Sequence, residues 1–203
     1  MKILGIGMSG LLGRNIKLDC DRPSHKEVDI TEIIIPKDYD CVVLLAAYTD
    51  VAKAETDRWN CFNVNVNGIM NVLEAYPKTP LVYISSEYAK NPVNFYSVTK
   101  SLAEQLVTQH TAPYLIIRTL FKPYPWPYEY AFTDQYTLGH YVTEIAPMID
   151  SIIQTWDRKE SRMLFTDIGG RKSMFDLAKI SKPDVKPNLT TDIKGVRIPK
   201  DYA

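Results

Sequence analysis

Tyr96 and Lys100 are the two side chains whose types and spacing most directly suggest chemistry, since they stand four residues apart. On a helix this spacing places both side chains on the same face. A neighbouring ammonium group stabilises a phenolate and lowers a tyrosine pKa that is otherwise about 10. Such a pair can give or take a proton near neutral pH. The pattern alone is weak, because about one match is expected by chance in a chain this rich in Tyr and Lys.

Ser86 is a candidate partner of this pair, because it ends the strand-like run at residues 83–86 that precedes Tyr96. The alternative is a hydroxyl that only bonds the backbone where the strand ends. Tyr96 and Lys100 are the predicted acid–base pair, and Ser86 is the candidate to act with them.

A glycine-rich turn with the spacing G-x-x-G-x-x-G follows the first predicted strand, at residues 2–7. Glycines allow a tight turn and let the backbone approach a pyrophosphate. A short helix expected over residues 11–18 would add free N–H groups and a favourable dipole. The candidate cofactor-binding residues here are Gly7, Ser9, Gly10, Leu11, Leu12 and Gly13. With Ser86 and the Tyr96–Lys100 pair, this turn predicts a nucleotide-dependent oxidoreductase, and a glycine turn without a ligand is the alternative.

Polar residues beyond the turn are candidates for the other end of a dinucleotide. Asp29, which precedes Ile30, could contact the adenine or its ribose, or could cap the residues that follow. Arg22 and Ser24 supply a cation and a hydroxyl suited to a 2′-phosphate. This favours NADP(H) over NAD(H) as cofactor, and a solvated polar loop is the alternative.

The elements that must position these residues alternate between buried strands and amphipathic helices. Strands are expected at residues 40–47, 80–85, 113–118 and 162–166, and helices at residues 60–76, 95–110, 139–156 and 173–181. Pro147 is expected to break or kink the third of these helices. The alternation predicts right-handed crossovers and an α/β fold with a doubly wound, mostly parallel sheet of the Rossmann type.

The character of the chain changes after Arg118, where prolines stand among aromatic residues in the segment 121–136. We expect a dinucleotide-binding domain over residues 1–120 and a small, reduced substrate-binding portion over residues 121–203. Trp126 in the aromatic segment could stack on a base or sugar, or bury a subunit contact in a homodimer. A proline-braced loop packed on its own core is the alternative.

Composition narrows the class of protein. The 203 residues are 45% hydrophobic, which is enough for one substantial core. The balance of 24 basic and 24 acidic residues does not suggest a nucleic-acid surface. No apolar run approaches the roughly 18 residues that span a bilayer, and the N-terminus lacks a signal-peptide layout. Three cysteines without a CxxC spacing and three scattered histidines favour a cytoplasmic protein with reduced thiols and no metal site.

These motifs, taken in series, resemble the extended short-chain dehydrogenases and, among them, the dTDP-4-dehydrorhamnose reductase group of sugar-nucleotide reductases. The stretches that carry the likeness are the glycine turn and residues 23–31, 46–55, 63–65, 84–88, 96–100, 118–119, 169–173 and 199–201. The resemblance covers most of the chain.

The resemblance implies reduction of a nucleotide-linked 4-keto sugar by a nicotinamide cofactor. In it Tyr96 is the general acid, Lys100 holds the nicotinamide ribose and Ser86 bonds the carbonyl oxygen. It further implies that Ala46, Ala47 and Tyr48 line the cofactor, and that Glu87, Tyr88 and Phe121 lie near the sugar. Asn65 is expected to bond the backbone within its own helix. An epimerase of the same family and a non-catalytic dinucleotide- or sugar-nucleotide-binding regulator are the alternatives.

Two departures from the family pattern bear on the site. Only residues 87–95 separate Ser86 from Tyr96, a link that is usually longer, and the first helix and second strand are cramped between Gly13 and Asp29. Both predict a compact member with a more open site that excludes less water. The short link motivates the non-catalytic alternative, whereas the presence of Ser86, Tyr96 and Lys100 together argues against it.

Overall fold

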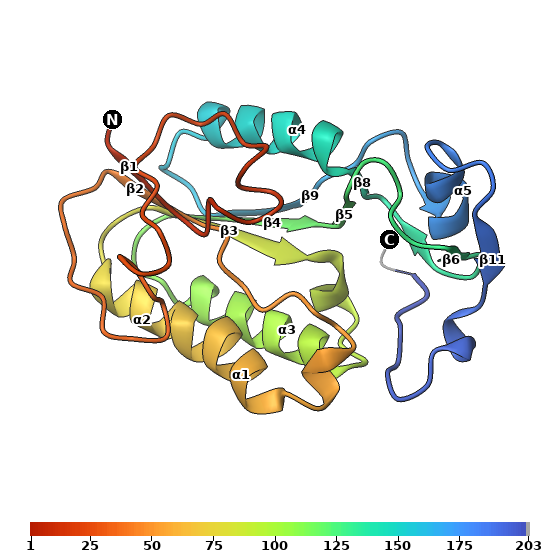
Figure 1. The fold of residues 1–203 in the computed structure, drawn as a ribbon. Coiled ribbons are helices and arrows are strands. Elements are labelled where there is room, and N and C mark those ends of the chain that lie inside the picture. The colour runs from red at the N-terminus through yellow and green to blue at the C-terminus, as the bar shows by residue number, and fades with distance from the viewer. Residues whose placement is uncertain (202–203) are drawn as a thin grey trace.

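Five parallel strands form the centre of the protein, whose computed structural model describes residues 1–201 (Figure 1). They follow the order β1-β2-β3-β4-β9 across the sheet. Their bounds are β1 Ile3–Ile6, β2 Cys41–Leu44, β3 Leu81–Ser86, β4 Tyr114–Thr119 and β9 Arg162–Phe165. Every residue of β1, β2 and β3 is buried, as expected of parallel strands covered on both faces. The predicted doubly wound, mostly parallel α/β sheet is confirmed.

Helices cover both faces of the sheet, as Figure 1 shows. One face carries α1 Arg58–Phe62, a π-helical turn Asn63–Asn67, α2 Gly68–Ala75 and α3 Phe95–Thr108, and the other carries α4 Val142–Thr155. Successive residues of a strand point to opposite faces. In β3, Val82 therefore belongs to the core that includes Ile149 of α4, whereas Tyr83 belongs to the core that includes Ile69 of α2 and Ala103 of α3.

The connection that leaves β1 and returns to the sheet lacks its expected helix. Residues 11–15 form turns, and the bridge between Leu4 and Asp21 is the one pairing of the returning segment with β1 in the described chain. A parallel crossover needs a dozen or more residues, and the glycine turn occupies much of this one. Leu12, Ile16 and Leu18 are buried in the core beneath α4 instead. The helix predicted over residues 11–18 is therefore wrong.

Two side chains bond the backbone of the segment that replaces this helix. Asp150 of α4 accepts from the N–H groups of residues 17 and 18, at 2.7 and 3.1 Å. Arg22 donates to the carbonyls of Gly13 at 3.1 Å and of Ile16 and Leu18 at 2.9 Å each. Because buried backbone polar groups need partners, Asp150 and Arg22 stabilise a conformation that has few hydrogen bonds of its own.

A smaller lobe lies beyond the carboxyl ends of the strands (Figure 1). It contains α5 Met174–Lys179 and three strand pairs: β5 Phe121–Lys122 with β8 His140–Tyr141, β6 Tyr130–Phe132 with β11 Lys186–Asn188, and β7 Tyr136–Thr137 with β10 Lys172–Ser173.

The lobe does not begin at a single boundary. Both α4 and β9 come after residue 120 and yet belong to the main layers. The chain after residue 120 therefore contributes to the main sheet and its helices as well as to the lobe. The strand predicted at residues 162–166 and the helix predicted at residues 173–181 are present as β9 and α5. Pro147 was expected to break or kink its helix; α4 continues through it without a break, and the kink stays a prediction. No helix within residues 1–201 is long and apolar enough to cross a membrane.

We expect Asp150→Ala to lower the free energy of unfolding by about 2–4 kcal/mol, because it leaves two backbone N–H groups without their acceptor. Urea denaturation measures this loss. Ser151→Ala, at an exposed neighbouring position of α4, is the control and should change stability by less than about 0.5 kcal/mol. Equal stability of the two variants would contradict the role given to Asp150.

Candidate active site

The glycine turn lies beside the carboxyl end of β2, at the edge of the sheet where α/β proteins bind ligands. Gly7 has a φ of +85°, and a Cβ there would collide with the backbone of Ala46. A Cβ on Gly13 would collide with the backbone of Met8. A Cβ on Gly10 would meet only the Gly7 carbonyl, at 3.4 Å. Gly7 and Gly13 are thus required by the packing of the turn, whereas Gly10 lies on its open, exposed side.

Tyr96 and Ser86 come together at the carboxyl end of β3. Tyr96 occupies the first turn of α3 and is 8% exposed. Burial raises the pKa of Tyr96 to about 12, and a hydrogen bond with the Ser86 hydroxyl opposes that rise. The Ser86 oxygen also accepts from the N–H of Tyr88 at 3.2 Å, and the Tyr88 ring packs edge-on against Tyr96 with the ring centres 6.0 Å apart. Two of the three predicted catalytic side chains therefore lie at the end of β3, each against Tyr88.

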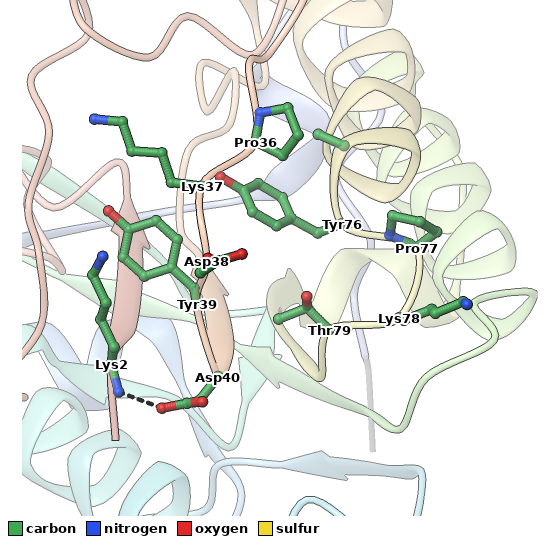
Figure 2. A pocket seen from close by; sticks show the side chains of 11 residues that line it. Lys2, Pro36, Lys37, Asp38, Tyr39, Asp40, Tyr76, Pro77, Lys78 and Thr79 are labelled. Atoms are coloured by element: carbon green, nitrogen blue, oxygen red, sulfur yellow. Dashed lines mark hydrogen bonds between the residues drawn. The ribbon is translucent and has the colours of Figure 1, made fainter.

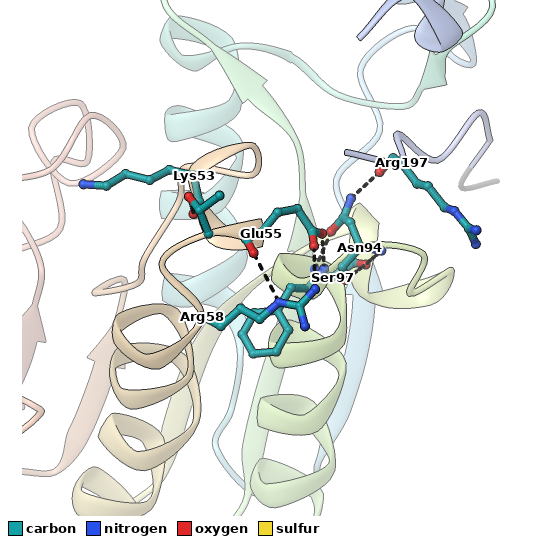
Figure 3. Close-up of polar contacts among 8 residues, drawn as sticks. Lys53, Glu55, Arg58, Asn94, Ser97 and Arg197 are labelled. Atoms are coloured by element: carbon teal, nitrogen blue, oxygen red, sulfur yellow. Dashed lines mark hydrogen bonds and ion pairs between the residues drawn. The ribbon is translucent and has the colours of Figure 1, made fainter. Parts of the chain in front are cut away.

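The start of α3, which carries Tyr96, is held by three separate segments (Figure 3). Asn94 and Ser97 form a capping box, in which Asn94 accepts from the Ser97 N–H at 2.8 Å and Ser97 accepts from the Asn94 N–H at 3.0 Å. Glu55 accepts the next backbone N–H of the helix at 2.8 Å. Asn94 in turn donates to the Arg197 carbonyl at 2.7 Å, so the C-terminal segment also fixes this end of the helix.

Lys100 is turned toward the sheet and is only 2% exposed. Its Nζ donates to the Ile84 carbonyl at 3.0 Å and lies 4.4 Å from the ring centre of Tyr83. Burial lowers the pKa of Lys100 to about 7, and the charge of Glu104 opposes this change. The expectation that Lys100 lowers the Tyr96 pKa is wrong in this structure, because desolvation disfavours the charged form of both groups.

Asn65 joins the end of β2 to α3. Its side-chain oxygen accepts from the Tyr48 N–H at 2.8 Å, and its amide nitrogen donates to the Tyr48 carbonyl at 3.2 Å and to the Thr99 hydroxyl at 3.0 Å. The bonds expected within its own helix are thus replaced by bonds between elements. Asn65 lies in the π-helical turn, a distortion that is frequent at functional sites. It sets the backbone of Tyr48, whose hydroxyl donates to Asp57 at 3.2 Å.

Glu87 is completely buried, although the sequence placed it near a substrate. Its carboxylate accepts from the Thr137 hydroxyl at 2.7 Å and from the Leu138 N–H at 3.2 Å. Burial raises the pKa of Glu87 to about 7, while these hydrogen bonds and the charge of Lys172 oppose the rise. In this structure Glu87 anchors the lobe to the residue that follows Ser86, and it has no exposed surface to offer a ligand.

The other three predicted substrate residues lie on two sides of the sheet. Tyr88 and Trp126 share one apolar cluster with Tyr96, whereas Phe121 packs against the core beneath α4. Trp126 is 6% exposed and its indole N–H donates to the Tyr130 carbonyl at 3.3 Å. Its ring is therefore not free to stack on a base or a second subunit, and the loop packed on its own core is what the structure shows.

The residues predicted to contact the far end of the dinucleotide make local bonds. Asp29 accepts from the N–H and the hydroxyl of Thr31, at 2.9 and 2.8 Å, and the backbone bond lowers its pKa. This is the capping alternative left open by the sequence. Ser24 bonds Glu27, Ile30 is buried, and the Arg22 guanidinium bonds the three carbonyls described above.

One buried ion pair beneath the site was missed by sequence reasoning. Arg118 of β4 makes two bonds to Glu104 of α3, at 2.9 and 2.6 Å, and Ser85 donates to the same carboxylate at 2.5 Å. The sequence does hold one indication of it. Glu104 stands four residues after Lys100, a spacing that places both side chains on the same face of a helix. Because Glu104 opposes the loss of the Lys100 charge, this pair contributes to the electrostatics of the site.

Two hollows lie outside this group of residues. The first, of about 540 Å³, opens at the amino ends of β1 and β2, where Lys2 bonds Asp40 (Figure 2). It is at the opposite edge of the sheet from the glycine turn. The second, of about 530 Å³, lies between residues 91–93 and 190–201, next to the capped start of α3. Within residues 1–201, no three side chains of His, Cys, Asp or Glu gather as they would around a metal ion.

Comparison with known families agrees with this geometry, since residues 1–122 match the family described as the RmlD substrate binding domain. The chain belongs to this family. Among curated proteins, the inverting UDP-N-acetylglucosamine 4,6-dehydratase of Campylobacter jejuni is 33% identical over 73 residues. That match covers 34% of this RmlD family member and 22% of the relative, so the chain aligns with about a fifth of the curated protein.

Solved structures extend the likeness over nearly the whole RmlD family member. The dTDP-4-dehydrorhamnose reductase of Clostridium acetobutylicum matches with a TM-score of 0.84 and 23% identity, over 98% of this chain and 88% of that chain. The corresponding reductase of Bacillus anthracis, solved with NADP, matches with a TM-score of 0.79 and 24% identity, over 98% and 87%. MoeE5, solved with UDP-glucuronic acid and NAD, matches with a TM-score of 0.71 and 16% identity, over 97% and 83%. At these identities the likeness shows the fold.

We expect Asn65→Ala to lower the free energy of unfolding by about 2–3 kcal/mol, because the buried polar groups of Tyr48 and Thr99 lose their partner. Chemical denaturation gives the value. The matched control is Asn67→Ala in the same π-helical turn, where the side chain bonds only Asn63 at a partly exposed position. If both variants lose the same stability, Asn65 does not join the two elements as described.

The pKa of Glu87 predicts a pH dependence of stability. Because this pKa is raised from 4.5 to about 7 in the folded protein, the protonated carboxyl is favoured by folding, and its contribution is complete below about pH 4.5 and is lost as the pH rises through about 7. Relative to Glu87→Gln, which does not ionise, the wild type should lose up to roughly 3 kcal/mol across this range. Denaturation at a series of pH values measures it. Glu74→Gln, at an exposed position of α2, should follow the wild type, and parallel curves for Glu87→Gln and wild type would contradict the assignment.

Proposed function

We propose that the protein is an NADP(H)-dependent reductase of a nucleotide-linked 4-keto sugar. The position of Ser86 and Tyr96 at the carboxyl end of β3, where both contact Tyr88, carries this proposal, because it brings a hydrogen-bond donor and a proton donor to the same edge of the sheet as the glycine turn. Two similar structures support this choice of ligands. One was solved with NADP, and another with UDP-glucuronic acid and NAD, so both a dinucleotide cofactor and a sugar nucleotide are bound within this fold. NAD(H) therefore remains the second choice of cofactor.

The glycine turn and the end of β2 are the parts of the chain that fit a dinucleotide. Ser9 and Gly10 are exposed at the tip of the turn, and a Cβ on Gly10 would leave nothing closer than 3.4 Å, so a pyrophosphate can approach there. Ala46, Ala47 and Tyr48 would line the nicotinamide half, with the backbone of Tyr48 held by Asn65. In this proposal the main sheet binds the cofactor and the lobe after residue 120 binds the sugar nucleotide.

Tyr96 is in the protonation state that a reduction needs. The cofactor supplies a hydride to the keto carbon, and the oxygen must then gain a proton. A pKa of about 12 keeps the Tyr96 hydroxyl protonated at neutral pH, so it can donate that proton to the oxygen. The Ser86 hydroxyl can donate a second hydrogen bond to the same oxygen as negative charge develops. Lys100, one helical turn after Tyr96, would reach the cofactor ribose.

A protein that binds a dinucleotide or sugar nucleotide without turnover is the second candidate. The missing first helix favours it, because a helix N-terminus would have supplied N–H groups and a dipole to a pyrophosphate. Arg22 favours it as well. The sequence predicted that this side chain would bind a 2′-phosphate, but its guanidinium donates to three backbone carbonyls of the segment that replaces the helix.

We expect Tyr96→Phe to lower the rate of NADPH consumption with a 4-keto sugar nucleotide by about 10²–10⁴-fold, because the proton donor is lost. The assay follows NADPH absorbance with dTDP-, UDP- and GDP-linked keto sugars, and fluorescence titration should show unchanged NADPH affinity. Tyr39→Phe, remote from the site beside Tyr76, is the control. Unchanged turnover in Tyr96→Phe would exclude it as the acid, and cofactor binding without turnover on any sugar would support the second candidate.

A further inference from the structure

Glu104 is a buried carboxylate of α3 that takes no direct part in the proposed reaction. It stands about two helical turns after Tyr96 and is 4% exposed. The Ser85 hydroxyl donates to its Oε1 at 2.5 Å. The Arg118 guanidinium donates to Oε1 at 2.9 Å and to Oε2 at 2.6 Å. Both oxygens of the carboxylate are therefore bonded, and every one of these bonds leads from α3 to the sheet.

The two partners of this carboxylate lie side by side at the carboxyl ends of neighbouring strands. Ser85 of β3 and Arg118 of β4 are paired in register. The next residue of β3 is Ser86, which ends the strand. One carboxylate thus ties the helix that carries Tyr96 to the strand that carries Ser86, one residue before that strand ends.

The same arginine contacts a ring that supports the short link after β3. The Arg118 guanidinium lies 5.3 Å from the centre of the Phe165 ring, and the Lys90 ammonium lies 5.6 Å from the same centre. Lys90 ends the short helical turn Glu87–Lys90, which directly follows β3. The group of side chains around Glu104 therefore contacts the link between the two candidate donors as well as the strand before it.

Stability alone does not account for an ion pair in this position. Both side chains are largely buried, so both charges have been taken out of water. Replacing such a pair by apolar side chains of similar volume is often neutral or even stabilising. Apolar packing does not, however, supply directed bonds of fixed length from one side chain to two strands.

We propose that Glu104 is a positioning residue, which fixes Tyr96 of α3 relative to Ser86 of β3 through its bonds to Ser85 and Arg118. It touches neither substrate nor cofactor in the proposed reaction. The hydroxyls of Ser86 and Tyr96 must both reach one keto oxygen, and a misplacement of about 1 Å can cost roughly 100-fold in rate. The inference rests on the proposed function, since it names the residue that keeps the two donors of that reaction together.

A triple replacement separates positioning from stability. Ser85→Ala, Glu104→Leu and Arg118→Met together remove the polar group without leaving a buried charge or hydroxyl unpaired, so we expect a urea midpoint close to that of the wild type. The kcat for reduction of a keto sugar nucleotide should still fall by about 10- to 100-fold. NADPH affinity and the KM for the sugar nucleotide should stay within about threefold. Glu74→Gln, an exposed carboxylate of α2 on the same face of the sheet, is the control and should keep the wild-type kcat.

Hydrogen exchange gives a readout that needs no turnover. The Tyr88 N–H donates to the Ser86 hydroxyl oxygen at 3.2 Å, so its protection reports whether that side chain keeps its place. We expect this N–H to exchange at least about 10-fold faster in the triple variant than in the wild type. The Val42 N–H, which bonds the Pro80 carbonyl at 2.9 Å within the sheet, should keep its rate.

Three outcomes would overturn the proposal. These are a wild-type kcat in the triple variant, an equal loss of kcat in Glu74→Gln, and unchanged exchange of the Tyr88 N–H. If the triple variant does not fold, Glu104→Gln, which keeps the shape of the side chain and one acceptor oxygen, takes its place with the same readouts. If the wild type reduces no keto sugar nucleotide, the proposed function fails, whereas the exchange of the Tyr88 N–H still decides whether Glu104 positions Ser86.

Discussion

The capped start of α3 is the constraint on which the candidate site depends. Tyr96 is placed by the first turn of a helix whose end is fixed by Asn94, Glu55 and the carbonyl of Arg197. These partners come from three parts of the chain that are far apart in sequence. A helix start needs such partners because its first N–H groups have none within the helix. The short link from Ser86 to Tyr96 is therefore held in place by many neighbours, although it lacks the length usual in the family.

Desolvation is the common cause of the unusual acid–base properties of this region. It raises the pKa of Tyr96 and of Glu87 and lowers that of Lys100, since in each case the charged form is disfavoured. The three groups lie around the end of β3 within one buried neighbourhood. A hydrogen bond or a charge moderates each change, from Ser86, Thr137 and Glu104 respectively. Tyr96 and Glu87 therefore keep their protons to a higher pH than usual, whereas Lys100 loses its proton at a lower pH than usual.

The sequence predicted the sheet and most helices because their apolar periodicity is strong and local. It also placed Ser86 at the end of a strand and Tyr96 at the start of the next helix, as β3 and α3 show. It failed where a distant side chain decides the local structure. Residues 11–18 have helical spacing, but the short return to the sheet and Asp150 of α4 set their conformation. Glu87 and Trp126 were assigned to a ligand because nothing local shows that the lobe buries them.

The bonds from Asp150 to the backbone of residues 17 and 18 have a consequence for how the protein is made. During synthesis the glycine turn leaves the ribosome long before α4 does, and a domain generally folds as a unit. Until residue 150 emerges, the segment after the turn has neither a helix nor an acceptor for these N–H groups. The segment that follows the glycine turn is translated early and is therefore among the last to reach its final conformation.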